Sequence, residues 1–409
     1  MLFHLILSNF ALFFENVFIM QTISIIRPKR RARRALLIQY FLMGLIFSTM
    51  LSRFPGLRTY YNISVSELSF VLFCMSIGSL CIMPFCSYLV GRFGSKKMTL
   101  AGFVYMAMFP FLALMPNIFV LYFYGALYGV FVSLTDVSVN GNSIIVENAY
   151  KRPIISMFHA LFYVGVFSGA ILSLFFITFE ISVFLHFLLI ALFSITIFSY
   201  IRRYFLKETI RCVPIKKRGV TFLFPKGNLL LIAFIALFGR IVEGSISDWS
   251  TVYMKMVVDF PENLAPIGLA IYSAFMSLGR FVGDSVRARY RDSLILMYCC
   301  LFATVGVFIM IIDTTPIFAF TGLFIAGIGI SCLVPIIYGL AGKQRGVTPA
   351  VGIAMVNTIS GTGFLFGPFV IGVVADMYGM RASFGYILLL ALIMTILVAI
   401  FRQYEKSRS

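Results

Sequence analysis

Twelve long apolar runs, separated by short polar breaks, constrain this chain more than any other feature. They fall near residues 35–52, 68–90, 98–116, 118–146, 153–178, 181–201, 228–254, 264–286, 293–312, 316–341, 350–375 and 382–401. A helix of about 20 apolar residues spans the roughly 30 Å hydrocarbon core of a bilayer. With 61% hydrophobic and only 12% charged residues, the chain has too little polar surface for a soluble globule. The runs therefore predict an all-α polytopic membrane protein with twelve transmembrane helices.

The positions of the basic residues predict which side of the membrane each loop faces. When alternate loops are assigned to opposite sides, 27 of the 33 Lys and Arg residues fall on one side, four on the other and two within spans. Cytoplasmic loops carry such an excess, so both termini are predicted to be cytoplasmic. The net charge of +18 is thus a topology signal and does not indicate nucleic-acid binding.

The second half of the chain repeats the first at an offset of 198 residues. This shift superposes Gly129 on Gly327, His159 on Asn357, Gly165 on Gly363, Gly169 on Gly367 and Ser52 on Ser250. Two parallel six-helix halves with a substrate site between them are a known transporter plan. We therefore expect two pseudo-symmetric six-helix bundles at 35–201 and 228–401, a basic cytoplasmic linker at 202–227 and a cytoplasmic tail at 402–409.

Residues 1–34 are predicted to be an N-terminal extension, first apolar and then basic. Three interpretations remain open for its apolar part, residues 1–26. It lies on the membrane surface as an amphipathic segment, it is an uncleaved leader, or the true start is Met20. No function is assigned to this extension.

Polar side chains interrupt the apolar runs at 118–146 and 153–178. Such groups are costly in hydrocarbon unless they face a partner or a water-filled cavity. Folding 118–179 as a hairpin about its basic turn at 149–153 brings Asn140 level with His159, and Asp136 level with Tyr163. We expect this polar layer to line the substrate cavity. Asp136 and His159 are candidates for proton coupling, and a neutral His159 hydrogen-bonded to Asn140 is the structural alternative.

The seventh run carries a polar stripe. Arg240, Glu243, Ser247 and Ser250 follow one another at spacings of three, four and three residues, which places them on one face of a helix. Glu243 lies near the middle of the bilayer by residue count, so we predict that it lines the cavity together with Ser247 and is a candidate proton carrier. The alternative is an internal Arg240–Glu243 pair. Trp249 follows closer to the outer surface, where an aromatic-belt residue is common.

Four more residues complete the predicted site. Arg280 and Asp284, four apart at the cytoplasmic end of the eighth run, are expected to form a gate, with a structural salt bridge as the alternative. Tyr338 is placed to stack on a sugar-like or aromatic ligand, and Asn357 joins the cavity as the repeat partner of His159.

The chemistry-bearing motifs of enzymes are missing from the sequence. It holds no Ser-hydrolase motif, zinc-protease motif or Walker phosphate loop, and its seven cysteines have no zinc-site spacing. No catalytic residue, cofactor or metal site is therefore expected, and an enzyme is not predicted.

Residues 35–401 resemble the major facilitator superfamily in their twelve spans, their basic central loop and the turn Gly91-Arg92-Phe93-Gly94-Ser95-Lys96-Lys97. The stretches Ser52–Pro55, Asp136–Asn140, Arg152–Ala160 and Glu243–Ser250 are similar to a bacterial inner-membrane branch related to fucose permease. The resemblance implies an inner-membrane location and gating roles for Arg92, Gly94 and Lys96. It also implies that Asp136 is the functional acid of the fourth helix, whereas the run at 35–52 contains no second acid.

These patterns predict a secondary active transporter that moves a small polar solute by alternating access, with protons as the candidate coupling ion. The expected partners are this solute and bilayer lipid, without nucleic acid, and the protein is expected to be a monomer. A proton-driven exporter of drugs or metabolites is the nearest alternative, and it predicts efflux of an amphipathic dye. A membrane sensor or scaffold that does not transport is the other, and it predicts ligand binding without flux.

Overall fold

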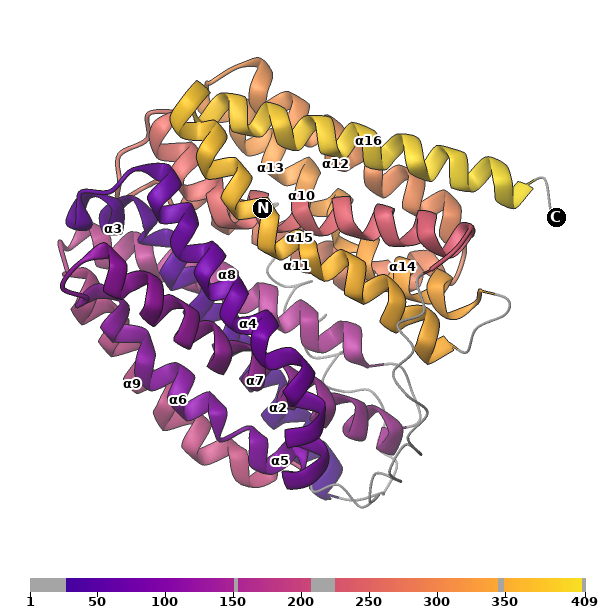
Figure 1. Ribbon diagram of the computed structural model, residues 1–409, viewed down its shortest axis with the longest axis horizontal. Coiled ribbons are helices and arrows are strands. Elements are labelled where there is room, and N and C mark those ends of the chain that lie inside the picture. The colour runs from indigo at the N-terminus through magenta and orange to yellow at the C-terminus, as the bar shows by residue number, and fades with distance from the viewer. Residues whose placement is uncertain (1–26, 151–153, 207–224, 345–348, 407–409) are drawn as a thin grey trace, which may run out of the picture.

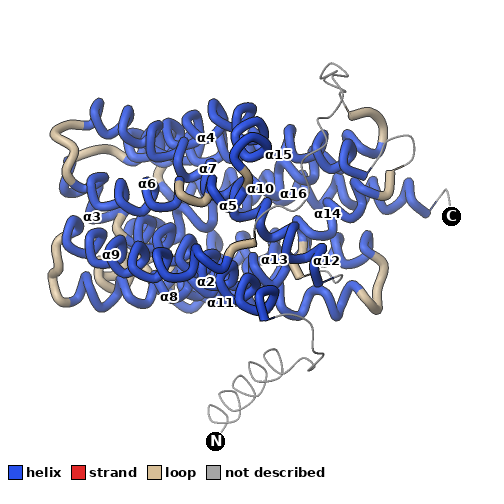
Figure 2. Tube along the Cα trace, turned by 90° about the horizontal axis from the view of Figure 1, so that it is seen from below, coloured by secondary structure: helices blue, strands red, loops and turns tan. Residues whose placement is uncertain are grey.

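The computed structural model describes residues 27–150, 154–206, 225–344 and 349–406. These residues form helices that run roughly along one long axis (Figure 1). Figure 2 shows connecting loops at both ends of this axis and, near α5, between them. In Figure 1 the short helices α3 and α5 lie at opposite ends of the first-half helices, and we call the two sides of the molecule the α3 end and the α5 end after them.

The first half of the chain begins with the long helix α2 and ends with α9. Its helices are α2 (Arg27–Ser52), α3 (Phe54–Tyr61), α4 (Val65–Phe93), α5 (Ser95–Met98), α6 (Ala101–Met108), α7 (Ile118–Tyr150), α8 (Ile155–Thr178) and α9 (Val183–Ile201). Two short 3-10 helices, η1 (Phe109–Ala113) and η2 (Arg202–Tyr204), continue α6 and α9.

The second half forms a matching series. Its helices are α10 (Asn228–Met256), α11 (Ile267–Arg287), α12 (Asp292–Ile312), α13 (Pro316–Ser331), α14 (Leu333–Gly342), α15 (Pro349–Tyr378) and α16 (Met380–Lys406). The helices of the two halves gather on opposite sides of the molecule in Figure 1, indigo to magenta against orange to yellow.

Within the described residues, ten helices are long and apolar enough to cross a membrane, and the all-helical membrane fold is confirmed. The predicted spans at 98–116 and 264–286 are not among the ten. In the first, α6 passes into η1 next to Pro110, which cannot donate a helical hydrogen bond. The second is α11, whose hydropathy is lowered by its charged residues Arg280, Asp284 and Arg287. Both segments nevertheless pack in the bundle, α6 beside α7 and α11 beside α8 and α13.

Two predicted boundaries differ from the structure. The first helix begins at Arg27, so the basic residues up to 34 form its first turns instead of an extension. Arginine is a good helix former, and the turns are anchored because Lys29 Nζ donates to the Ala149 carbonyl at 3.0 Å. The last helix continues to Lys406, beyond the predicted end at 401. Residues 1–26, 151–153 and most of the predicted linker, 207–224, lie outside the described part.

Glycines at the repeat positions lie at equivalent helix crossings. A Cβ atom on Gly129 of α7 would lie 1.9 Å from a carbonyl oxygen of α4, and one on Gly327 of α13 would lie 2.7 Å from a carbonyl oxygen of α11. Gly165 of α8 and Gly363 of α15 face the backbones of α2 and α10 at 2.1 and 3.1 Å. Small residues allow helix backbones to approach this closely in membranes. The repeat at 198 residues therefore reflects the same helix packing in both halves.

Two seams join the halves, α8 against α11 and α4 against α15. At the α3 end, the Asp376 carboxylate of α15 accepts hydrogen bonds from the backbone N–H groups of Val65 at 3.1 Å and Ser66 at 2.9 Å. Trp249 of α10 packs there against Phe54, with ring centroids 6.4 Å apart. Trp249 thus lies near an end of the bundle, as expected, but its side chain is fully buried against protein, so it is not a lipid-facing residue of an aromatic belt.

Candidate functional site

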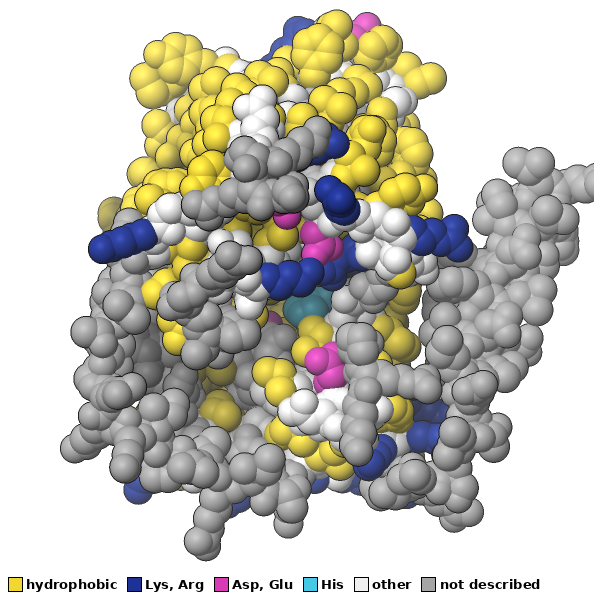
Figure 3. All heavy atoms as spheres, turned by 90° about the vertical axis from the view of Figure 1, so that its right-hand side faces the viewer, with side chains coloured by type: hydrophobic (Ala, Val, Ile, Leu, Met, Phe, Trp, Pro, Cys, Tyr) yellow, Lys and Arg dark blue, Asp and Glu magenta, His cyan; other side chains and the backbone are white. Residues whose placement is uncertain are grey.

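Polar side chains gather where the two halves face each other. Figure 3 looks onto the α5 end and shows basic, acidic and histidine side chains in the centre of this face. These side chains are recessed in Figure 3, and we call the region between the halves here the cleft. Three groups of hydrogen-bonded residues, described in turn below, lie in or beside it. Each group takes its residues from helices that are separate in sequence.

The first group is built by α7 and α2. Asn140 lies one turn after Asp136, and its Nδ2 atom donates to Asp136 Oδ1 at 3.0 Å and to the Asp136 carbonyl at 2.9 Å. The Tyr40 hydroxyl on α2 donates to Asn140 Oδ1 at 2.7 Å and accepts from Ser143 Oγ at 3.2 Å. Asp136 is exposed, and Arg240 of the other half lies within electrostatic range of it. This carboxylate therefore faces the cleft.

His159 of α8 meets this group through Tyr40. Their rings lie edge to face, with centroids 5.2 Å apart. The sequence predicted that Asn140 and His159 would lie level in one hairpin, but Tyr40 is the described partner of Asn140 Oδ1. The reason is that α8 packs along α2 whereas α7 packs along α4. Sequence reasoning missed Tyr40, because one tyrosine in an apolar run looks like a core residue.

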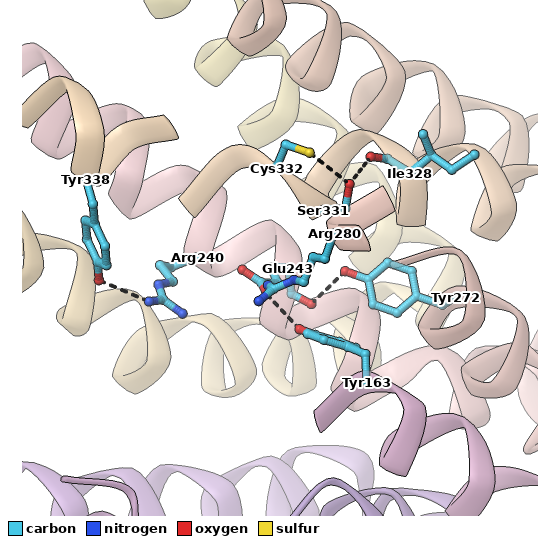
Figure 4. Close-up of polar contacts among 9 residues, drawn as sticks. All are labelled: Tyr163, Arg240, Glu243, Tyr272, Arg280, Ile328, Ser331, Cys332 and Tyr338. Carbon is cyan, nitrogen blue, oxygen red and sulfur yellow. Dashed lines mark hydrogen bonds and ion pairs between the residues drawn. The ribbon is translucent and has the colours of Figure 1, made fainter. Parts of the chain in front are cut away.

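The second group joins three helices around Glu243 of α10 (Figure 4). Glu243 Oε1 accepts from Arg280 Nη2 of α11 at 3.0 Å and from the Tyr163 hydroxyl of α8 at 2.7 Å. The Glu243 and Arg280 side chains are only 6% and 7% exposed. The Arg280 guanidinium also lies over the Tyr163 ring, 4.7 Å from its centroid. A buried ion pair of the second half is thus hydrogen-bonded to the first half.

This arrangement corrects one expectation. Arg240 was the alternative partner of Glu243, but Glu243 pairs with Arg280, because a buried carboxylate needs a cation and hydrogen-bond donors. The gate predicted for Arg280 and Asp284 stays a prediction, because the Asp284 side chain lies outside the described part of the structure. Tyr163, predicted level with Asp136, belongs to the Glu243 group.

The third group surrounds Arg240, one turn before Glu243 on α10. Arg240 Nη2 donates to the Tyr338 hydroxyl of α14 at 3.2 Å, and Tyr338 donates to Asn357 Oδ1 of α15 at 2.7 Å. All three side chains are half-buried. Figure 4 shows Arg240 and Glu243 turned toward different partners. The polar stripe predicted on this helix therefore serves two groups.

The remaining predicted residues lie away from the open cleft. Ser247 is 5% exposed, one turn beyond Glu243. Gly94 has a φ of +83° at the junction of α4 and α5, a conformation that favours glycine. Arg92 Nη1 donates to the Tyr88 hydroxyl at 2.8 Å and Lys96 Nζ to the Arg203 carbonyl at 2.9 Å. These contacts stay within the first half, and a gating role for this turn stays a prediction.

The cleft thus combines a carboxylate, two amides, phenols, an imidazole and a guanidinium from both halves. Such a set can donate to and accept from the hydroxyl, amine, carbonyl or carboxylate groups of a small polar molecule. Among the described residues, no group of His, Cys, Asp and Glu side chains could hold a metal ion.

Comparison with known families decides the general class. The sequence model of one protein family, the Major Facilitator Superfamily, matches residues 36–349 of this chain. The chain belongs to this superfamily. Membership makes it a multi-pass membrane transporter and not an enzyme, with a small-molecule substrate and bilayer lipid as partners.

The similarity to known proteins extends over most of this superfamily member. It is 28% identical over 359 residues to an uncharacterized MFS-type transporter of Yersinia pestis, covering 86% of this chain and 91% of the relative. Its fold is similar to that of a point mutant of the nucleoside transporter NupG, with a TM-score of 0.74, 14% identity and coverage of 92% of this chain and 100% of NupG. A bacterial homolog of the human lysosomal transporter Spinster, inward-facing and unoccupied, gives a TM-score of 0.72 at 14% identity and covers 93% and 98% of the two chains.

Proposed function

We propose that this superfamily member is a secondary active transporter that moves a small polar solute by alternating access through the central cleft. The observation that carries the proposal is the origin of the cleft residues. Asp136, Asn140 and His159 come from the first half, and Arg240 and Asn357 come from the second half. A solute that contacts residues of both halves would couple its binding to the relative movement of the halves, as alternating access requires.

We further infer that the described conformation opens the cleft toward the cytoplasm of a bacterial cell. The contacts between the halves described above run from Asp376 at the α3 end to Tyr163 at the level of Glu243. The polar groups are visible from the α5 end (Figure 3). Most basic residues, including Lys96, Arg203 and Lys343, belong to loops on this side, and cytoplasmic loops carry the positive excess. Both termini would then be cytoplasmic, in the inner membrane.

Proton coupling is proposed to run first through Asp136. Its carboxylate is exposed to the cleft and accepts one side-chain hydrogen bond, from Asn140. Glu243, the second candidate, is held in the ion pair with Arg280, so it can take part only if this pair separates. His159, half-buried beside Tyr40, is the third proton-handling candidate. Because one chain supplies both halves and the whole cleft, a monomer is proposed to be sufficient for transport.

The experiment that tests this function is solute counterflow in proteoliposomes. The panel would contain labelled sugars, polyols, nucleosides and small organic acids, each measured with and without an imposed pH gradient. We expect at least one solute to exchange, and the pH gradient to drive its accumulation. Asp136→Asn should still exchange the solute but should lose the response to the gradient, because an amide cannot carry a proton.

Asp259→Asn is the matched control, since it removes the same charge from an exposed acid after α10. It should transport like the unmodified protein. A protein that stays folded and exchanges no solute of the panel would contradict transport of this substrate class. Asp136→Asn with an unchanged gradient response would contradict the proton role of Asp136 and leave the transport proposal standing.

A further inference from the structure

A second polar surface lies outside the cleft, where α2, α5 and η2 meet at the α5 end. The Arg31 guanidinium lies over the Tyr204 ring, 5.8 Å from its centroid. The Arg203 guanidinium lies 4.9 Å from the same centroid and 4.0 Å from that of Tyr200. Lys96 Nζ donates to the Arg203 carbonyl at 2.9 Å and joins α5 to the group. We call Arg31, Lys96, Tyr200, Arg203 and Tyr204 the basic–aromatic patch.

The patch lies at the level where these helices leave the apolar part of the bilayer. Arg31 precedes the apolar run of α2 by about one helical turn, roughly 5 Å, and Tyr204 is the last residue of the α9 span. Arg31, Tyr200 and Arg203 are exposed. Tyrosine rings and arginine side chains are favoured at the depth of lipid headgroups. The patch is therefore positioned beside phosphates of the surrounding membrane.

The positive charge of Arg31 and Arg203 is not balanced by described acidic side chains. The ion pairs formed by the described residues join Glu243 to Arg280 and Asp292 to Arg287 and Lys343. Arg30, Arg34 and Arg202 are exposed close by in the sequence and add further positive charge. Arg203 hydrogen-bonds the neighbouring tyrosine hydroxyls, and a guanidinium has five N–H donors, so further N–H groups remain for the oxygens of a phosphate. A tyrosine ring beside each guanidinium restrains the orientation in which these donors are presented.

Apolar side chains continue the patch toward the membrane interior on both helices. Ile38 lies seven residues after Arg31 on α2 and is 37% exposed. Phe193 lies seven residues before Tyr200 on α9 and is 49% exposed. A spacing of seven residues keeps each pair on one helical face. The surface thus offers cations for a phosphate and, directly below them, apolar contacts for acyl chains.

We propose that the basic–aromatic patch binds the headgroup of an anionic phospholipid, with the acyl chains lying against Ile38 and Phe193. The combination of unbalanced guanidinium groups with an adjoining exposed apolar face fits a lipid phosphate, whereas a soluble phosphate would gain nothing from the apolar face. Because α2 carries Tyr40 and packs along α8, a lipid bound here contacts a helix that also lines the cleft.

Native mass spectrometry of the delipidated protein in detergent tests the proposal with phosphatidylglycerol and phosphatidylcholine as probes. We expect phosphatidylglycerol to bind at least tenfold more tightly than phosphatidylcholine. Each basic group near an anionic surface contributes about fivefold in affinity, so Arg31→Gln/Arg203→Gln should bind phosphatidylglycerol roughly 25-fold more weakly. Inorganic phosphate in tenfold excess should not displace the lipid.

Arg289→Gln/Arg291→Gln is the matched control, because it removes two exposed charges after α11 in the second half. This control should bind the lipid like the unmodified protein. Arg31→Lys/Arg203→Lys keeps the charge without the planar fork and should bind with an intermediate affinity, which also covers the case that the glutamine variant does not fold. Equal losses in the two glutamine variants, unchanged binding in both patch variants, or displacement by inorganic phosphate would each overturn the proposal.

Discussion

Replacing Asp376 by Ala should loosen the closed α3 end, because this carboxylate caps a helix of the opposite half. Helix α4 begins with a capping box in which Ser64 Oγ accepts from the Glu67 N–H and Glu67 Oε2 accepts from the Ser64 N–H. The N–H groups of Val65 and Ser66 remain without an intrahelical acceptor. Asp376 accepts from both of them, at 3.1 and 2.9 Å. The first turn of α4 is thus completed only when the two halves are in contact.

The size of the effect follows from known costs of removing helix caps. Loss of an N-terminal cap typically costs about 1 kcal/mol, and a carboxylate near a helix N-terminus contributes roughly 0.3–1 kcal/mol. Asp376 is exposed, so water recovers part of this loss when the halves separate. We expect about 1 kcal/mol, which is a roughly fivefold increase in the ratio of molecules open at the α3 end to molecules closed there.

Trp249 is a built-in reporter of this opening. It is the one tryptophan of the chain, it is fully buried, and it packs against Phe54 of the first half. Acrylamide quenching of its fluorescence should rise from the unmodified protein to Asp376→Asn, which keeps an acceptor oxygen, and further to Asp376→Ala. Asp259→Asn should leave quenching unchanged. If Asp376→Ala is quenched no more than the unmodified protein, the contact does not hold the α3 end closed and the reasoning is refuted.

Two further predictions concern packing inside the membrane. Glu243→Gln and Arg280→Gln should each lower thermal stability strongly, because breaking a buried ion pair costs about 3–5 kcal/mol. The double variant should lose at least about 0.5 kcal/mol less than the sum of the two single losses. Strictly additive losses, measured by Trp249 fluorescence during unfolding, would contradict the Glu243–Arg280 pair. Gly165→Ala should destabilise the folded protein by about 1–3 kcal/mol, because the added Cβ would lie 2.1 Å from the Phe41 carbonyl oxygen. Gly361→Ala is the control: its Cβ meets no described atom within 4 Å, so this variant should be neutral or stabilising. Equal unfolding temperatures for these two glycine variants would show that the close crossing of α8 and α2 is not needed.

The features that sequence predicted well are those with a local cause. Apolar runs of sufficient length define membrane helices wherever they occur, because each helix satisfies its own backbone hydrogen bonds. The repeat at 198 residues indicated Gly165 and Gly363 as equivalent, and they do lie at equivalent crossings. In each case the sequence contains the whole physical reason.

The partners of the buried charges could not be predicted in the same way. Arg280 lies 37 residues from Glu243, and their contact depends on how α11 crosses α10. Tyr40 joins α7 to α8 only because α2 packs beside both. Trp249 was taken for an aromatic-belt residue because composition does not show that Phe54 of α3 packs on it. Such contacts depend on which helices are neighbours in the bundle. A single sequence indicates the neighbours of a helix only indirectly, through the repeat between the two halves.

The distribution of contacts along the two seams suggests how binding could move the halves. Near the middle of the membrane, Tyr163 binds Glu243 and Ser277 Oγ donates to the Ala160 carbonyl at 3.2 Å. A rotation about this level changes these contacts least and separates Asp376 from α4 most, since the displacement grows with distance from the axis. A solute that bridges Asp136 of one half and Arg240 of the other would draw the α5 ends together and so oppose the contacts at the α3 end. A ligand shifts an equilibrium only by its differential affinity for the two states, so the solute must gain more from bridging the halves than the contacts at the α3 end contribute, about 1 kcal/mol of which is expected from Asp376.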